Sequence, residues 1–164
     1  MLQVAPATEA HLPGILSILN HMIRHTDAIW TEDEWDLDQM NAWFNERTAA
    51  KYPVLVAVEN GQVVGYCSYA QFRAKSGYCH TMEHTVYVAD GQQGKGVGNV
   101  LMEKLVERAR QDNVHALVAG IDAGNRGSIR FHERLGFVQV GHMPEVGIKR
   151  GRWLDLVFMQ LTMN

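Results

Sequence analysis

The chain has 164 residues, of which 46% are hydrophobic and 20% are charged, and its formal net charge is −3. This length and balance indicate one globular domain over residues 1–164, large enough for a sizeable core. The acidic balance argues against a nucleic-acid binder, which normally carries a basic face. No apolar run approaches the roughly 18 residues of a membrane span and no signal peptide is evident, so we expect a cytoplasmic protein without membrane contact.

The first part of the chain predicts a short strand followed by two helices. Leu2–Val4 indicates the strand. Thr8 can cap a helix in which apolar residues recur at three- and four-residue steps as far as Ile23. A second helix is expected to begin near Asp36 and to end before Pro53, because proline cannot continue a helix.

The next part predicts two strands, Val54–Val58 and Gln62–Tyr69, joined at Asn60-Gly61. An Asn-Gly pair between two apolar runs is a strong hairpin signal, because both residues accept the positive φ angles of a tight turn. Residues 71–80 show no periodicity and are expected to be irregular.

Residues 83–105 are the most informative stretch. Val86, Tyr87 and Val88 predict a strand, glycines recur at alternate positions from Gly94 to Gly98, and helical periodicity begins near Val97. A strand, a glycine-rich turn and a helix N-terminus together make an anion site, because glycine lets the backbone approach a phosphate and the first N–H groups of the helix lack partners.

Two well-known phosphate loops do not match this turn. A P-loop requires Ser or Thr directly after its lysine, whereas Lys95 is followed by Gly96. A dinucleotide fingerprint requires a third glycine where this chain has Asn99 or Leu101. What remains is the pattern Gln93-x-x-Gly96-x-Gly98.

The last part of the chain predicts a buried strand, a short helix and two further strands. The strand spans Val114–Asp122, and the helix runs from Ser128 to a stop at Gly136. Phe137–Val146 and Arg152–Leu161 are the final strands, across a Gly147–Gly151 connection. The order β-α-α-β-β-β-α-β-α-β-β predicts an α/β or α+β sandwich built on one mixed sheet.

The Gln93-x-x-Gly96-x-Gly98 pattern resembles the Gln/Arg-x-x-Gly-x-Gly/Ala pyrophosphate loop of the GNAT superfamily of N-acetyltransferases. The element order is also that of the GNAT fold, a mostly antiparallel sheet flanked by helices. Nearly the whole chain is similar to the phosphinothricin and methionine sulfone/sulfoximine N-acetyltransferases. The pieces that carry this resemblance are Leu12–Leu16, Ala28–Trp30, Tyr52–Val56, Glu83–Val88, Gly94–Gly98, Leu135–Phe137, Met143-Pro144 and Gly151–Leu156.

The resemblance implies an acetyl-CoA-dependent enzyme that acetylates the α-amine of a small amino acid, and it implies a homodimer. The implied contacts with acetyl-CoA are Val86, Tyr87 and Val88 along the pantetheine arm, Gln93, Gly94, Lys95, Gly96, Val97, Gly98 and Asn99 around the pyrophosphate, and Asn125 with the helix-capping Ser128. The implied or candidate acceptor-site residues are Trp30, Phe72, Arg73, Ala74, Lys75, Glu83, His84 and Thr85.

Two residues are candidates for proton transfer. Acetylation of an amine needs a base, because the substrate ammonium must lose a proton before it attacks a thioester, and Glu83 precedes the anion loop closely enough to serve. His132 lies where the family usually has a tyrosine that is thought to protonate the departing thiolate. An imidazole can donate that proton or can position the substrate, and both roles stay open.

A small amino-acid substrate also needs a guanidinium or ammonium group for its carboxylate. The candidate cations in loops are Arg73, Lys75, Lys149, Arg150 and Arg152. The chain departs from the resemblance at Gln93, where many relatives have arginine, and at Phe72, Glu145 and Arg150. These departures leave acetyl transfer intact but widen the choice of acceptor to peptide or polyamine amines.

Two rival functions remain. One is a CoA-binding domain of the same fold without catalysis. The other is a zinc hydrolase, because His80-Thr81-Met82-Glu83-His84 matches the H-x-x-E-H pattern of inverted zincins. That pattern requires a helix, on which both histidines share a face, whereas these residues lead into a strand that turns Glu83 away from His80 and His84. We therefore expect no metal site.

Overall fold

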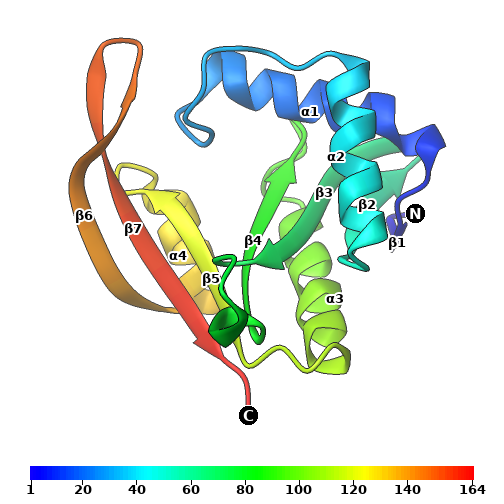
Figure 1. Cartoon of the computed structure of the whole chain (residues 1–164). Helices are drawn as coiled ribbons and strands as arrows, with labels where there is room; N and C mark the ends of the chain where they lie inside the picture. Colours follow the sequence, from blue (N-terminus) through cyan, green and yellow to red (C-terminus); the bar gives the residue numbers. More distant parts are fainter.

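The computed structural model describes residues 1–164 and shows one seven-stranded sheet in the order β1-β2-β3-β4-β5-β7-β6 (Figure 1). The strands are β1 (Gln3–Pro6), β2 (Val54–Glu59), β3 (Gln62–Gln71), β4 (Thr81–Val88), β5 (Ala116–Asp122), β6 (Val138–Lys149) and β7 (Arg152–Thr162). The helices are α1 (Leu12–His25), α2 (Leu37–Ala49), α3 (Val97–Gln111) and α4 (Arg126–Arg134). Only β4 and β5 pair in parallel, so the expected mixed and mostly antiparallel sheet is confirmed.

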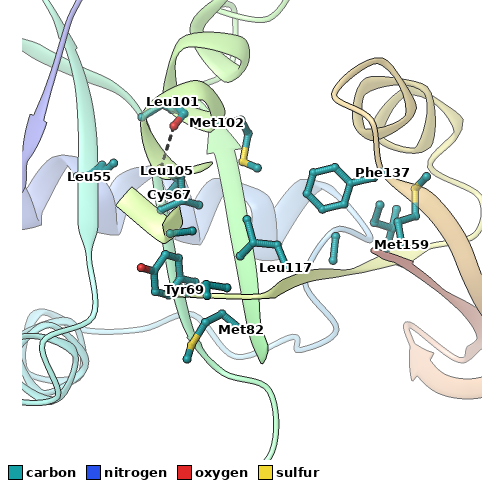
Figure 2. Close-up of a cluster of buried hydrophobic side chains, with 14 of the residues drawn as sticks. Leu55, Cys67, Tyr69, Met82, Leu101, Met102, Leu105, Leu117, Phe137 and Met159 are labelled. Atoms are coloured by element: carbon teal, nitrogen blue, oxygen red, sulfur yellow. Dashed lines mark hydrogen bonds between the residues drawn. The ribbon is translucent and has the colours of Figure 1, made fainter. Parts of the chain in front are cut away.

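The two faces of the sheet are covered by different helices, and each face has its own core. The larger core packs α3 and α4 against the sheet. Figure 2 shows part of it, with Leu117 lying between the α3 residues Leu101 and Leu105 and the pair Phe137 and Met159. The smaller core packs α1 and α2 on the opposite face. Because side chains alternate along a strand, neighbouring residues of β4 belong to different cores. None of the four helices is long and apolar enough to cross a bilayer.

The parallel pair in the centre of the sheet is short. β4 and β5 are paired only from Thr81 opposite Ala116 to Glu83 opposite Val118. Beyond Glu83 the two strands diverge, as Figure 1 shows, and the backbone groups of β4 that face β5 have no strand partner there. Unpaired backbone groups need another hydrogen-bonding partner, so this opening is a natural place for a ligand to lie as an additional strand.

Several element boundaries differ from expectation; β3, for example, runs on to Gln71, and β5 begins only at Ala116. β4 begins at Thr81, which places Glu83 inside the strand and not at its head. β6 runs on to Lys149. The ring of Trp30 lies where a Cβ atom of Gly147 would be, so this glycine serves packing and not a turn. α4 is capped by Asn125, not Ser128.

The α4 correction has a local cause. Asn125 Oδ1 accepts a hydrogen bond from the N–H of Ser128 at 3.1 Å, and the helix therefore begins at Arg126. Asparagine is at least as good a cap as serine, so both residues satisfied the sequence pattern. Ser128 lies instead in the first turn of the helix.

Candidate active site

A cavity of about 270 Å³ opens where β4 and β5 diverge. It is walled by both diverging strands, by the first turn of α3 and by one side of α4. Its lining residues are Met22, Ala28, His84, Thr85, Val86, Tyr87, Val88, Gln93, Gly98, Ala119, Gly120, Ile121, Asp122, Asn125, Ser128, Phe131 and His132. The cavity thus brings together residues of β4, the glycine turn and α4, the three segments from which the sequence predicts contacts with acetyl-CoA.

The glycine turn ends in a left-handed residue directly before α3. Gly94 and Gly96 have φ angles of 78° and 82°, which other residues adopt only with strain. The N–H groups of residues 93–99 donate to no group of the protein, and Val100 is the first in α3 to do so, toward the carbonyl of Gly96. These free donors at the positive end of a 15-residue helix fit a diphosphate.

The contact between α3 and α4 is tight. A Cβ atom on Gly98 would lie 3.2 Å from the ring of Phe131, so only glycine leaves Phe131 and the cavity wall undisturbed. Asn125 and Ser128 line the cavity at the start of α4. Phe131 was not singled out in the sequence, although it follows Ser128 by three residues and so lies on the same helix face.

Glu83 lies at the point where β4 and β5 part. It faces the α1–α2 side of the sheet, opposite to His84, and its carboxylate makes neither a hydrogen bond nor an ion pair. A Cβ on Gly120 would lie 3.1 Å from Glu83 Oε2, so the glycine on β5 makes room for the carboxylate. Burial raises the pKa of Glu83, and Arg73 and Arg47 act against that shift. A carboxylate with a raised pKa is a stronger base.

His84 and His132 form a buried pair on the other face of the sheet, each 3% exposed. His132 Nδ1 lies 2.8 Å from the Ser128 carbonyl, which can only accept, so this nitrogen carries the proton. The neutral ring then accepts through Nε2 from His84 Nε2, 3.1 Å away. His84 Nδ1 is left as a buried acceptor without a partner.

The electrostatics of this pair favour neutral rings. Burial lowers the pKa of His84 to about 3, with a further contribution from His132. Burial also lowers the pKa of His132, although its hydrogen bond to the Ser128 backbone acts in the opposite direction. Both imidazoles are therefore uncharged at neutral pH, and His132 presents no N–H group to the cavity.

Glu83 does not line this cavity, and of the candidate acceptor-site residues only His84 and Thr85 do. Phe72 packs edge-on against Phe158, and Arg73 lies over the Phe72 ring at 5.0 Å. Ala74 and Lys75 are exposed. Trp30 donates to the Asp27 carbonyl and covers Gly147, so its ring faces the β6–β7 hairpin.

Three of the five candidate cations are already engaged. Lys149 is 1% exposed and donates to the carbonyls of Ile23, Thr26 and Ile29 at 2.8, 2.6 and 2.7 Å. Arg152 pairs with Asp27 at 2.5 Å, and Arg150 approaches the same carboxylate at 3.5 Å. These contacts fix the segment after α1 to the β6–β7 hairpin. Arg73 and Lys75 alone of the five have no such partner.

The H-x-x-E-H pattern lies almost entirely on β4. His80 Nδ1 contacts the Asn113 carbonyl at 2.9 Å, and His84 turns into the core beside His132. The structure contains no group of three or more His, Cys, Asp or Glu side chains arranged to hold a metal ion.

The comparisons with known proteins agree with this geometry. The model of the acetyltransferase (GNAT) family matches residues 16–137. A methionine sulfoximine/methionine sulfone acetyltransferase of Pseudomonas paraeruginosa is 49% identical over 162 residues, which cover 98% of this chain and 94% of that protein. This chain belongs to the GNAT family. It is an N-acetyltransferase, and its acetyl donor is acetyl-CoA.

Solved structures of GNAT proteins superpose closely on this one. The yncA acetyltransferase of Salmonella typhimurium, determined with acetyl-CoA, gives a TM-score of 0.97 at 44% identity, covering 100% of this chain and 95% of that one. A phosphinothricin acetyltransferase of Sinorhizobium meliloti, also with acetyl-CoA, gives 0.95 at 31% identity, covering 99% and 89%. The GNAT fold and the resemblance to both kinds of acetyltransferase are thereby confirmed.

Proposed function

We propose that this GNAT enzyme acetylates the α-amine of a small amino acid of the methionine sulfone, methionine sulfoximine or phosphinothricin type. The observation that carries the proposal is the opening between β4 and β5, which has free N–H groups at one end and the unpaired Glu83 carboxylate at the other. The relatives named for those substrates match this chain over nearly its whole length.

The proposed cofactor contacts follow the cavity. The N–H groups between Gln93 and Asn99 hold the diphosphate, the unpaired edge of β4 from Val86 to Val88 holds the pantetheine arm, and Asn125 and Ser128 border it. Acetyl-CoA supplies an acetyl group activated as a thioester. Backbone N–H groups of β4 that have lost their β5 partner are suited to polarise its carbonyl.

Glu83 is the proposed general base. The amine must be neutral to attack, and Glu83 takes its proton from the α1–α2 side of the opening while the donor enters from the side of α3 and α4. The C–N bond forms as the C–S bond breaks, so the acetyl group passes directly to the amine. The sulfur departs as a thiolate and takes up the second proton that the nitrogen loses as the amide forms. The Phe72–Lys75 loop and Thr85 would border the acceptor, with Trp30 farther away at the hairpin.

His132 is proposed to act through His84. Since both nitrogens of neutral His132 are used within the protein, it holds His84 so that Nδ1 remains a free acceptor in the cavity wall. The alternative, proton donation to the thiolate, requires His132 to be charged. The pH profile of kcat distinguishes the two roles. If His132 is the acid, the wild type shows an alkaline limb that His132→Asn removes. If His132 positions His84, His132→Asn lowers kcat at every pH.

The test measures thiol release from acetyl-CoA with a panel of amines. We expect activity with methionine sulfone, methionine sulfoximine or phosphinothricin, and little with a peptide or a polyamine. Glu83→Gln should lower kcat about a hundredfold or more and leave acetyl-CoA affinity nearly unchanged, whereas the exposed Glu103→Gln should resemble the wild type. Acetyl-CoA binding without thiol release for any amine would indicate a non-catalytic CoA-binding domain instead.

We also propose that the enzyme is a homodimer. β6 is an edge strand, and apolar side chains of the β6–β7 hairpin are exposed: Val138 61%, Val140 55%, Met143 44%, Val146 47%, Ile148 54% and Trp153 63%. Several exposed apolar side chains on one edge hairpin are typical of a protein interface. Light scattering should give twice the mass of one chain, and Trp153→Lys should give a single chain; a monomeric wild type would contradict the proposal.

The cytoplasm is the proposed location. Cys67 and Cys79 are both free thiols, and Cys79 is exposed. Free exposed thiols persist where the surroundings are reducing. Fractionation of the producing cells would check the location, and recovery outside the cytoplasmic fraction would contradict it.

A further inference from the structure

Arg47 is a half-buried guanidinium without a carboxylate partner. It stands in the last turn of α2, and its one hydrogen bond runs from Nη1 to Ser68 Oγ at 2.9 Å. Its charged group lies over the Trp43 ring at 5.2 Å, and no Asp or Glu oxygen is within 4.0 Å of it. Removal from water without an ionic partner is unusual for arginine. Most of its donors remain free.

The strand register places Arg47 beside Glu83. Ser68, which anchors the guanidinium, lies directly opposite Thr85, and the next pair on the same face is Ala70 with Glu83. Residues two apart on a strand are separated by about 7 Å. Glu83 is also without a partner, and Arg47 counteracts the rise in its pKa. Two opposite charges thus lie near each other, unpaired, with a gap between them.

An α-amino acid fits that gap. Its ammonium group and its carboxylate lie on the same carbon, so one can contact Glu83 while the other contacts Arg47. Two hydrogen bonds of about 2.8 Å, with roughly 3 Å between the two groups of the ligand, span up to about 9 Å. The two-residue step of about 7 Å from Glu83 to Thr85, the residue opposite Ser68, lies within this span, and each end of the ligand would meet the opposite charge.

A second cavity continues from this point. It has a volume of about 130 Å³ and shares Thr85 and Tyr87 with the main cavity. Its walls are mostly aromatic and aliphatic, and Arg47 lies at its border. The remaining lining residues are Leu19, Ile29, Trp35, Met40, Trp43 and Tyr66. An amino acid held between Glu83 and Arg47 can place its side chain there.

We propose that Arg47 binds the α-carboxylate of the acceptor and so restricts the enzyme to free α-amino acids. The inference rests on the proposed N-acetyltransferase function. The residue assigned to the carboxylate is thus Arg47, whose guanidinium is anchored by Ser68, and not the exposed Arg73. Peptide N-termini and polyamines lack that carboxylate, so they would leave the guanidinium buried and unpaired.

The test compares L-methionine sulfone with its carboxamide, which has the same shape and no negative charge. The measured quantity is the ratio of kcat/KM for the acid to kcat/KM for the amide. We expect the wild type to prefer the acid, and Arg47→Gln to lower the ratio about 10- to 100-fold, because a charge-assisted contact is lost. Arg47→Lys should lower it less, because the positive charge is kept. It should still lower it, because an ammonium cannot bind a carboxylate through two parallel bonds.

Controls separate this contact from folding and from overall activity. The exposed Arg110→Gln should keep the wild-type ratio, and thermal melting with acetyl-CoA titration should show that each variant folds. Should Arg47→Gln fail to fold, the ratio for Arg47→Lys decides, and a fall of about threefold or more supports the proposal. An unchanged ratio in the Arg47 variants overturns the proposal. It is also overturned if Arg73→Gln loses the preference for the acid while the Arg47 variants keep it. A wild type that acetylates both compounds equally refutes this inference alone, whereas one that acetylates neither refutes the proposed function.

Discussion

Lys149→Met tests how the segment after α1 is held against the β6–β7 hairpin. The substitution keeps the length of the side chain but removes the ammonium group that donates to the carbonyls of Ile23, Thr26 and Ile29. Arg150 still donates to the Ile23 carbonyl at 3.2 Å, so that group keeps a partner. The Thr26 and Ile29 carbonyls have no other donor within the protein.

Two carbonyls left without partners cost about 1–3 kcal/mol each. Part of that loss is offset, because methionine removes the cost of burying a charge; that burial lowers the pKa of Lys149. We therefore expect a net loss of about 3 kcal/mol, which corresponds to a fall in Tm of about 6–12 °C for a domain of this size. Because Met22 and Ala28 flank this segment and line the cavity, KM for acetyl-CoA should also rise.

Urea denaturation and differential scanning calorimetry measure the stability change. Lys104→Met is the matched control, because Lys104 is 57% exposed and pairs only with Glu107 at 3.4 Å; its effect should stay within about 0.5 kcal/mol. If Lys149→Met is as stable as the control, the carbonyl contacts contribute nothing net, and the reasoning is refuted.

Three further predictions concern the site. Because burial raises the pKa of Glu83 and a base must be ionised, kcat should fall as pH drops through a value above the usual 4.3 or so of glutamate, and Glu83→Gln should abolish that limb in a pH–rate profile. Gly96→Ala should cost about 1 kcal/mol in unfolding free energy and weaken acetyl-CoA binding in calorimetric titration, because its φ is 82°; equal affinity would contradict the proposed diphosphate site. Gly120→Val should lower kcat more than it raises KM for acetyl-CoA, since its Cβ would lie 3.1 Å from Glu83 Oε2; an unaltered kcat would show that the carboxylate need not stay in place.

Much of the fold could be predicted because its signals are local. Apolar periodicity marked α1 and α3, the Asn60-Gly61 turn marked the β2–β3 hairpin, and the glycines from Gly94 to Gly98 marked the turn before α3. Boundaries were less certain where two local solutions are equally good. Asn125 and Ser128 can both cap a helix, and a glycine such as Gly147 can serve either a turn or a close packing contact.

Arg47 shows why part of the site could not be predicted. In the sequence it is one more charged residue on a helix, without a motif around it. Its importance depends on Ser68, 21 positions away, and on Glu83, which only the β3–β4 register brings alongside. The same is true of His84 and His132, whose hydrogen bond joins residues 48 positions apart.

The sequence by itself determined the strand–turn–helix that we propose as the diphosphate site and the family to which the chain belongs, because glycine conformations and helix N-termini depend on near neighbours. Only the tertiary structure decided where β4 parts from β5, that Glu83 and His84 face opposite sides of the sheet, and which charges remain without partners. Those features depend on pairing between distant segments, and it is the unpaired groups at their meeting point that can act on a substrate.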